Sequence, residues 1–172
     1  MKTAIIGAGA IGGLVGARLA LAGENVTFIA RGANLEALRK NGIKLVEHDG
    51  SERVARNVTA TNDYAAAGVH DLVILAMKAH QVEAVLTDLP RLIGPQTVSV
   101  PMQNGIPFWY FHAHGGALAG TPVRTVDPQG AVMRGVPLAQ VLGCVGYPAA
   151  ELTAPGVVRH VEGDRFPIGE LD

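Results

Sequence analysis

Short apolar runs alternate with stretches of helical periodicity along the first hundred residues. The runs cover residues 3–6, 26–30 and 71–76, and a fourth strand is expected over residues 97–100. Between the first two runs, apolar positions recur with a period near 3.6 from Ile11 to Ala22, which is typical of a helix that packs on one face. Runs without polar alternation favour parallel strands covered on both faces. The pattern therefore predicts an α/β fold with a doubly wound, mostly parallel sheet.

Further helices are expected between the later runs. Asn34 is placed to cap a short helix that ends at Asn41, because a side-chain amide oxygen can accept from the first free backbone N–H groups. An alanine-rich helix is expected over residues 63–67. A longer helix is expected from about Ala79 to Leu89, with Pro90 closing it.

The remaining strands are expected outside the centre of the sheet. Asp49-Gly50 is a turn signal between residues 43–46 and 53–61, and this predicts a hairpin or a pair of short strands. Three more strands are expected over residues 141–145, 156–161 and 166–168. They would extend the sheet as an antiparallel or mixed edge.

The turn between the first run and the first helix has the spacing G-x-G-x-x-G. It consists of Gly7, Ala8, Gly9, Ala10, Ile11 and Gly12. The first glycine permits a tight turn, the second lets a pyrophosphate approach the backbone, and the third lets the helix lie close to the sheet. Free N–H groups and the positive end of the helix then face the phosphates. We therefore expect a Rossmann-type fold with a dinucleotide site.

The second run ends at Arg31, about twenty residues after the glycine turn, where such folds contact the adenosine ribose. An acidic residue there would hold the 2′-hydroxyl of NAD, whereas an arginine suits the 2′-phosphate of NADP. Arg31 therefore predicts NADP(H) as the cofactor. The alternative is that Arg31 is a solvated residue at a strand end.

Two further strand ends carry polar side chains toward the same edge. Lys78 follows the third run, and Gln103 and Asn104 follow the expected fourth strand. Ligands in open α/β sheets bind beyond the carboxyl ends of the strands. Asn104 precedes Gly105, so a purely local turn is the alternative interpretation of this residue.

Composition excludes several classes of function. The chain has 172 residues and a net charge of −1, without a basic cluster that would indicate nucleic acid or an anionic membrane. Glycines and Arg18 interrupt the apolar N-terminus, which makes it a poor signal or membrane segment. The single cysteine, Cys144, fits a cytoplasmic location, and no metal-ligand spacing is present.

The sequence resembles the N-terminal half of the ketopantoate reductase (2-dehydropantoate 2-reductase) family over essentially all 172 residues. The resemblance rests on the glycine turn, Arg31, Met77-Lys78-Ala79-His80-Gln81 and Gln103-Asn104-Gly105. It implies that Arg31 binds the 2′-phosphate, that Gln81 lies near the cofactor, and that Lys78 and Asn104 lie where nicotinamide and substrate meet.

The resemblance also implies NADPH-dependent reduction of a 2-keto acid, 2-dehydropantoate, on the route to coenzyme A. In the family a helical second domain carries the general acid and a substrate-binding glutamate. We expect residues 1–172 to be one NADP-binding domain, with the linker to that domain near residues 169–172. By itself the chain should bind NADPH but turn over little substrate.

Two alternatives remain open from the sequence. The chain could be a dinucleotide sensor without catalysis, which would need the glycine turn and Arg31 but not Lys78 or Asn104. It could also serve a reductase for a different keto acid. Apolar residues 108–111 or the final strands could be uncovered, which would favour a homodimer.

Overall fold

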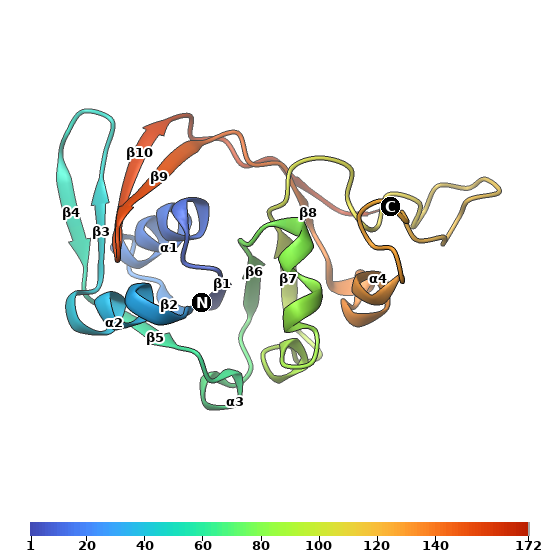
Figure 1. The fold of residues 1–172 in the computed structure, drawn as a ribbon, viewed down its shortest axis with the longest axis horizontal. Coiled ribbons are helices and arrows are strands. Elements are labelled where there is room, and N and C mark those ends of the chain that lie inside the picture. Colours follow the sequence, from blue (N-terminus) through green and yellow to red (C-terminus); the bar gives the residue numbers. More distant parts are fainter. Residues whose placement is uncertain (172) are drawn as a thin grey trace.

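The fold is centred on five parallel strands, β1 (Lys2–Ile6), β2 (Asn25–Ile29), β5 (Val58–Thr61), β6 (Leu72–Leu75) and β7 (Val98–Pro101). The computed structural model describes residues 1–171 and gives the strand order β5-β2-β1-β6-β7 (Figure 1). The chain builds outward from β1 in one direction and then from β6 in the other. The prediction of a doubly wound parallel sheet is confirmed, and its topological switch point lies between β1 and β6.

Side chains of the central strands alternate between two apolar layers, as the period of a strand requires. Ile5 packs with Leu14 of helix α1 (Ala10–Leu21) on one face. Ile6 packs with Val82 on the other face. Because both faces are covered, the strands are continuously apolar, which explains the pattern in the sequence.

A second sheet covers the side of α1 that faces away from the main sheet (Figure 1). Its strands are β3 (Ile43–Val46), β4 (Glu52–Ala55), β9 (Ala149–Ala154) and β10 (Val157–Glu162), in the order β4-β3-β10-β9. A Cβ atom on Gly13 would lie 2.4 Å from Cγ2 of Val158. Glycine therefore lets α1 approach β10 closely. A two-stranded ribbon joins β8 (Gly143–Cys144) to β11 (Ile168–Gly169).

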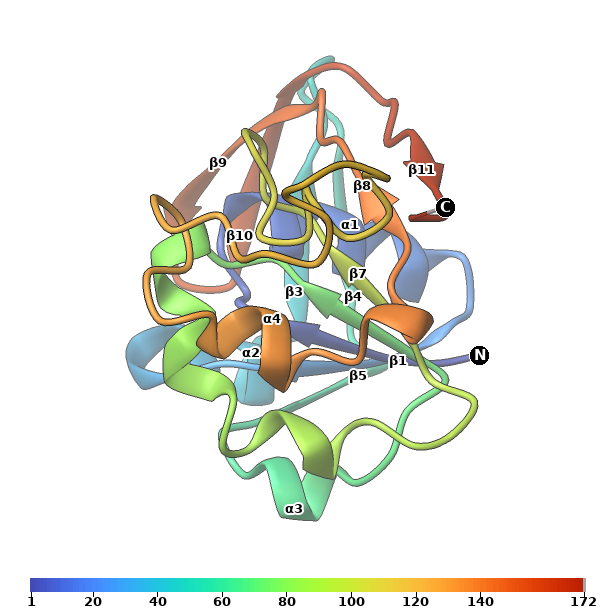
Figure 2. The ribbon, with the colours of Figure 1, turned by 90° about the vertical axis from the view of Figure 1, so that its right-hand side faces the viewer.

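Shorter helices complete the fold, several of them in front of the main sheet in Figure 2. They are α2 (Gly32–Asn41), α3 (Tyr64–Ala67), α4 (Ala131–Gly135) and the 3₁₀ helices η1 (Ala79–Gln81), η2 (Glu83–Val85), η3 (Leu89–Arg91) and η4 (Leu138–Gln140). The helix expected over residues 63–67 is confirmed, with Asp63 as its cap. In the part of the chain that the structure describes, no helix has the length and apolar character of a membrane span.

Two predictions about helices are wrong. Helix α2 begins at Gly32 with Arg31 as its N-cap, so Asn34 lies inside the first turn and its side chain does not cap the helix. The expected helix over residues 79–89 is a series of 3₁₀ turns, with bonds such as that from the Val85 N–H to the Val82 carbonyl. Val82 and Leu89 are buried here, as they would be on one face of an α-helix. The apolar periodicity therefore cannot distinguish an α-helix from a series of 3₁₀ turns.

The peripheral strands also differ from expectation. The hairpin around Asp49-Gly50 is confirmed, but residues 53–61 divide between β4 of the second sheet and β5 of the main sheet. The last strands do not extend the main sheet, since only Val141 forms a single bridge to Ser99 within residues 1–171. Instead β10 pairs with β3 and with β9, a strand the pattern did not predict.

A partly buried cluster of charged side chains and one histidine ties the second sheet to α1. Glu47 accepts hydrogen bonds from Nη2 of Arg53 at 2.6 Å and from Nη2 of Arg18 at 3.1 Å, and Nδ1 of the buried His160 lies 3.1 Å away. Burial by itself would raise the pKa of the Glu47 carboxyl, but the arginine hydrogen bonds outweigh it and hold the pKa below its usual value. The cluster therefore favours an ionised carboxylate.

Two members of this cluster, together with His48, form the one group of potential metal ligands in the described part of the chain. Glu47, His48 and His160 place three candidate ligand atoms within 4.8 Å of one another. Two guanidinium groups already neutralise the carboxylate, and a cation would have to displace them. The geometry thus favours a structural link between α1, β10 and the hairpin.

We predict that Glu47→Gln lowers the free energy of unfolding at neutral pH by roughly 1–3 kcal/mol, because the Arg18 and Arg53 guanidinium groups and the buried His160 lose the negative charge that they contact. The pKa of the Glu47 carboxyl is lower in the folded than in the unfolded protein. The carboxylate therefore stabilises the fold fully at pH values above its unfolded-state pKa, and this stabilisation is lost as the pH falls through its folded-state pKa. Denaturant titrations should show that the variant loses less stability than wild type on acidification. Glu36→Gln is the control, since its carboxylate is 73% exposed. Equal losses in both variants would contradict the account.

Candidate functional site

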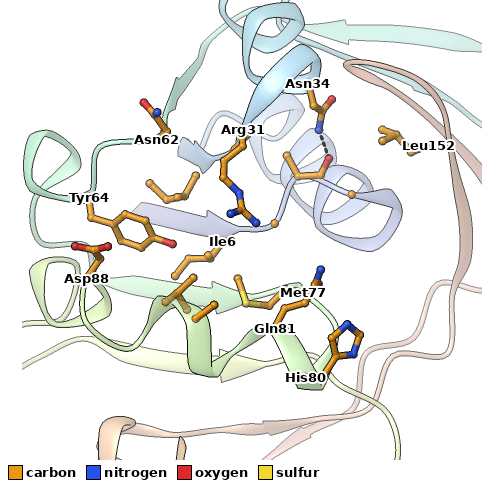
Figure 3. Close-up of a pocket in the computed structure, with 17 residues that line it drawn as sticks. Ile6, Arg31, Asn34, Asn62, Tyr64, Met77, His80, Gln81, Asp88 and Leu152 are labelled. Carbon is orange, nitrogen blue, oxygen red and sulfur yellow. Dashed lines mark hydrogen bonds between the residues drawn. The ribbon is translucent and has the colours of Figure 1, made fainter.

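A cleft of about 630 Å³ lies beyond the carboxyl ends of β1, β2 and β6, at the switch point of the main sheet. Figure 3 shows its lining, which the glycine turn, the start of α2 and the 3₁₀ segment after β6 surround. Its members are Ile6, Gly7, Ala8, Gly9, Ile29, Ala30, Arg31, Asn34, Asn62, Tyr64, Met77, His80, Gln81, Ala84, Val85, Asp88 and Leu152.

The glycine turn is shaped by close backbone contacts. Gly7 has φ +100°, and a Cβ atom there would lie 3.1 Å from the Ala76 carbonyl oxygen. A Cβ atom on Gly12 would lie 2.0 Å from the Gly7 carbonyl oxygen. Both positions require glycine for the turn to exist, as the sequence motif predicts.

Gly9 differs from its neighbours because a Cβ atom there would meet nothing within 4 Å. It is the N-cap of α1, and within residues 1–171 no side chain caps this helix end. The first N–H groups of a helix lack partners inside the helix and attract anions. Gly9 therefore leaves a vacant approach to the backbone where a phosphate group would fit.

Arg31 supplies positive charge at the same cleft. It is exposed and precedes α2, and in Figure 3 its guanidinium extends over the cleft beside Ile6. It forms no ion pair with any residue of the described chain. An arginine in this position can bind a second anionic group of a ligand in the cleft.

The outer part of the cleft contains residues that the sequence did not single out. Asn62 follows β5, Tyr64 begins α3, and Asp88 precedes η3. Burial raises the pKa of the Tyr64 phenol to about 12, with a further rise from Asp88 that Arg31 partly opposes. The phenol therefore stays protonated and can donate a hydrogen bond in the cleft. The strand predicted over residues 53–61 ends directly before Asn62, but the pattern indicates a peripheral strand, whereas β5 pairs with β2 in the main sheet.

The segment after β6 is held by side-chain hydrogen bonds to its backbone. Gln103 donates from Nε2 to the carbonyls of Leu75, at 2.7 Å, and Met77, at 2.9 Å. Gln81 lines the cleft and accepts from the Lys78 N–H at 3.0 Å. These bonds fix the position of the Lys78 backbone, and Lys78 itself is exposed.

Asn104 lies outside the main cleft. Its carboxamide pairs with the backbone of Gly146, donating to the carbonyl at 2.8 Å and accepting from the N–H at 3.0 Å. It borders a smaller apolar cavity of about 150 Å³, together with Ile106, Phe108 and Trp109. In the present arrangement this amide joins the end of β7 to the segment before β9.

The structure thus brings together only some of the expected site residues. Gly7, Ala8, Gly9, Arg31 and Gln81 line the cleft. The other five expected residues do not line the cleft in the part of the chain that the structure describes. They are Ala10, Ile11, Gly12, Lys78 and Asn104.

Comparison with known proteins identifies the arrangement. Residues 3–172 match the family model described as ketopantoate reductase PanE/ApbA. The 2-dehydropantoate 2-reductase of Mesorhizobium japonicum is 48% identical, and the match covers 99% of this chain and 52% of that protein.

Solved structures agree with the sequence match. A crystal structure from Ralstonia solanacearum MolK2, of a protein assigned as a ketopantoate reductase, has a TM-score of 0.91 and 44% identity, covering 98% of this chain and 52% of that one. The crystal structure of a PanE/ApbA family ketopantoate reductase from Ralstonia eutropha JMP134 has a TM-score of 0.73 and 28% identity. The match covers 98% of this chain and 49% of that one. The chain spans about half the length of these relatives. It belongs to the ketopantoate reductase PanE/ApbA family of dinucleotide-dependent oxidoreductases.

Proposed function

We propose that this chain binds NADPH in the main cleft and supplies the cofactor-binding half of a 2-dehydropantoate 2-reductase. The observation that carries the proposal is the combination of the vacant approach at Gly9 with the unpaired Arg31 in one cleft. NADPH carries a pyrophosphate and a separate 2′-phosphate, so it needs one anion site at the helix end and a second at the tip of β2. The two groups present match that requirement.

In the proposed reaction, bound NADPH would supply a hydride to the carbonyl carbon of a 2-keto acid. Lys78 would lie near the carboxylate or carbonyl and stabilise the negative charge that develops on oxygen. Asn104 would need to release Gly146 before its amide could contact substrate, since both its polar atoms are engaged. The Lys78 side chain is the better candidate for direct contact because it is exposed.

The identity of the substrate and of its proton donor is also part of this proposal. About half of the Mesorhizobium japonicum relative lies outside its match with these 172 residues. The ketopantoate reductase resemblance assigns the general acid and the substrate-binding glutamate to a helical second domain. We therefore propose that this chain alone binds NADPH with little turnover; the homodimer and the cytoplasmic location stay predictions.

A matched pair of glycine variants tests the phosphate site. Gly9→Ala should leave stability nearly unchanged, since the methyl group meets no protein atom, but should weaken NADPH binding about tenfold or more by blocking the backbone approach. Gly12→Ala should instead destabilise the fold by roughly several kcal/mol, because its methyl group would clash with the Gly7 carbonyl oxygen. Calorimetric titration and thermal unfolding measure both effects. Undiminished NADPH binding by Gly9→Ala would remove the phosphate assignment.

A charge-matched pair tests the cofactor preference. Arg31→Ala should lower the affinity for NADPH about tenfold or more and leave the affinity for NADH within about twofold, because only NADPH carries the 2′-phosphate. Lys78→Ala removes an equal charge from a residue outside the cleft lining and should change both affinities by no more than about twofold. Fluorescence titration gives the dissociation constants. Equal losses for both nucleotides in Arg31→Ala would overturn the proposed preference.

A further inference from the structure

One side chain connects three segments that are far apart in the sequence. Asn34, in the first turn of α2, donates from Nδ2 to the Ala8 carbonyl in the glycine turn (Figure 3). Its Oδ1 accepts from the N–H of Gly156, in the turn between β9 and β10, at 2.7 Å. Both polar ends of the amide are therefore engaged with backbone, and the residue lines the main cleft.

The turn at Gly156 is a firm anchor for this connection. Gly156 has φ +72°, and a Cβ atom there would lie 3.2 Å from Cβ of Ala37 in α2. Its carbonyl accepts from the Lys44 N–H of β3 at 2.8 Å. The turn is thus held between α2 and the second sheet, so Asn34 links the glycine turn to an element that is itself fixed.

The bond to Ala8 sets the direction of a neighbouring donor. The Ala8 carbonyl and the Gly9 N–H belong to one planar trans peptide unit, in which the two groups point in opposite directions. Because Asn34 holds the carbonyl toward α2, the Gly9 N–H must point away from α2. Gly9 is the position where the backbone is open to a phosphate group.

We propose that Asn34 is a positioning residue for the diphosphate of a bound dinucleotide, acting through the Ala8–Gly9 peptide. This rests on the proposed nucleotide function and assigns a separate part of it. Arg31 selects the 2′-phosphate, whereas Asn34 orients the backbone donor that NADPH and NADH share. The second sheet therefore contributes to binding through the Gly156 turn.

The test compares Asn34→Ala with a matched asparagine elsewhere. Asn57 also donates from Nδ2 to a backbone carbonyl, that of Ala20 at 3.0 Å, and it does not line the cleft. We expect Asn34→Ala to weaken NADPH and NADH about five- to tenfold each, so that the ratio of the two affinities changes by less than about twofold. Asn57→Ala should leave both affinities unchanged. Asn34→Ser, a milder change, should show the same pattern if Asn34→Ala does not fold.

Other outcomes separate the possible failures. Wild-type affinities in a folded Asn34 variant would overturn the positioning role and leave the nucleotide function standing. A selective loss of NADPH affinity would also overturn it, because Asn34 would then act on Arg31. Failure of the wild-type chain to bind either nucleotide would overturn the proposed function itself, together with the inference that depends on it.

Discussion

The contact between the start of α1 and the edge of the main sheet is the constraint on which the cleft depends. A Cβ atom on Gly12 would overlap the Gly7 carbonyl, and one on Gly7 would crowd Ala76 at the end of β6. Without side chains at these points, α1 begins directly above the switch point between β1 and β6. The free N–H groups of its first turn consequently lie at the carboxyl ends of β1 and β6, and Arg31 reaches the same cleft from the end of β2.

The second sheet supports this arrangement from behind. It packs against α1 where Gly13 meets Val158, and the Glu47 cluster joins its hairpin to the same helix. Through Asn34 it also contacts the glycine turn itself. The cleft is therefore held from two sides, since the main sheet supplies the strand ends and the second sheet restrains the helix and turn that face them.

Local signals in the sequence were sufficient for the centre of the fold and part of the site. The glycine turn and Arg31 follow strands whose apolar runs are short and continuous, so spacing alone places them at one edge. The pairing of β10 with β3 joins residues more than a hundred positions apart in the chain, and periodicity carries no information about such partners. For the same reason the pattern predicts Asn34 as a local cap, although its partners are Ala8 and Gly156.

A crystal structure of this chain grown with NADPH tests the central claim most directly. The account predicts that the diphosphate lies against the turn of residues 7–12 at the first turn of α1, with the 2′-phosphate beside the Arg31 guanidinium. A nucleotide bound elsewhere, or one in the cleft with its phosphates directed away from the glycine turn, would contradict the account.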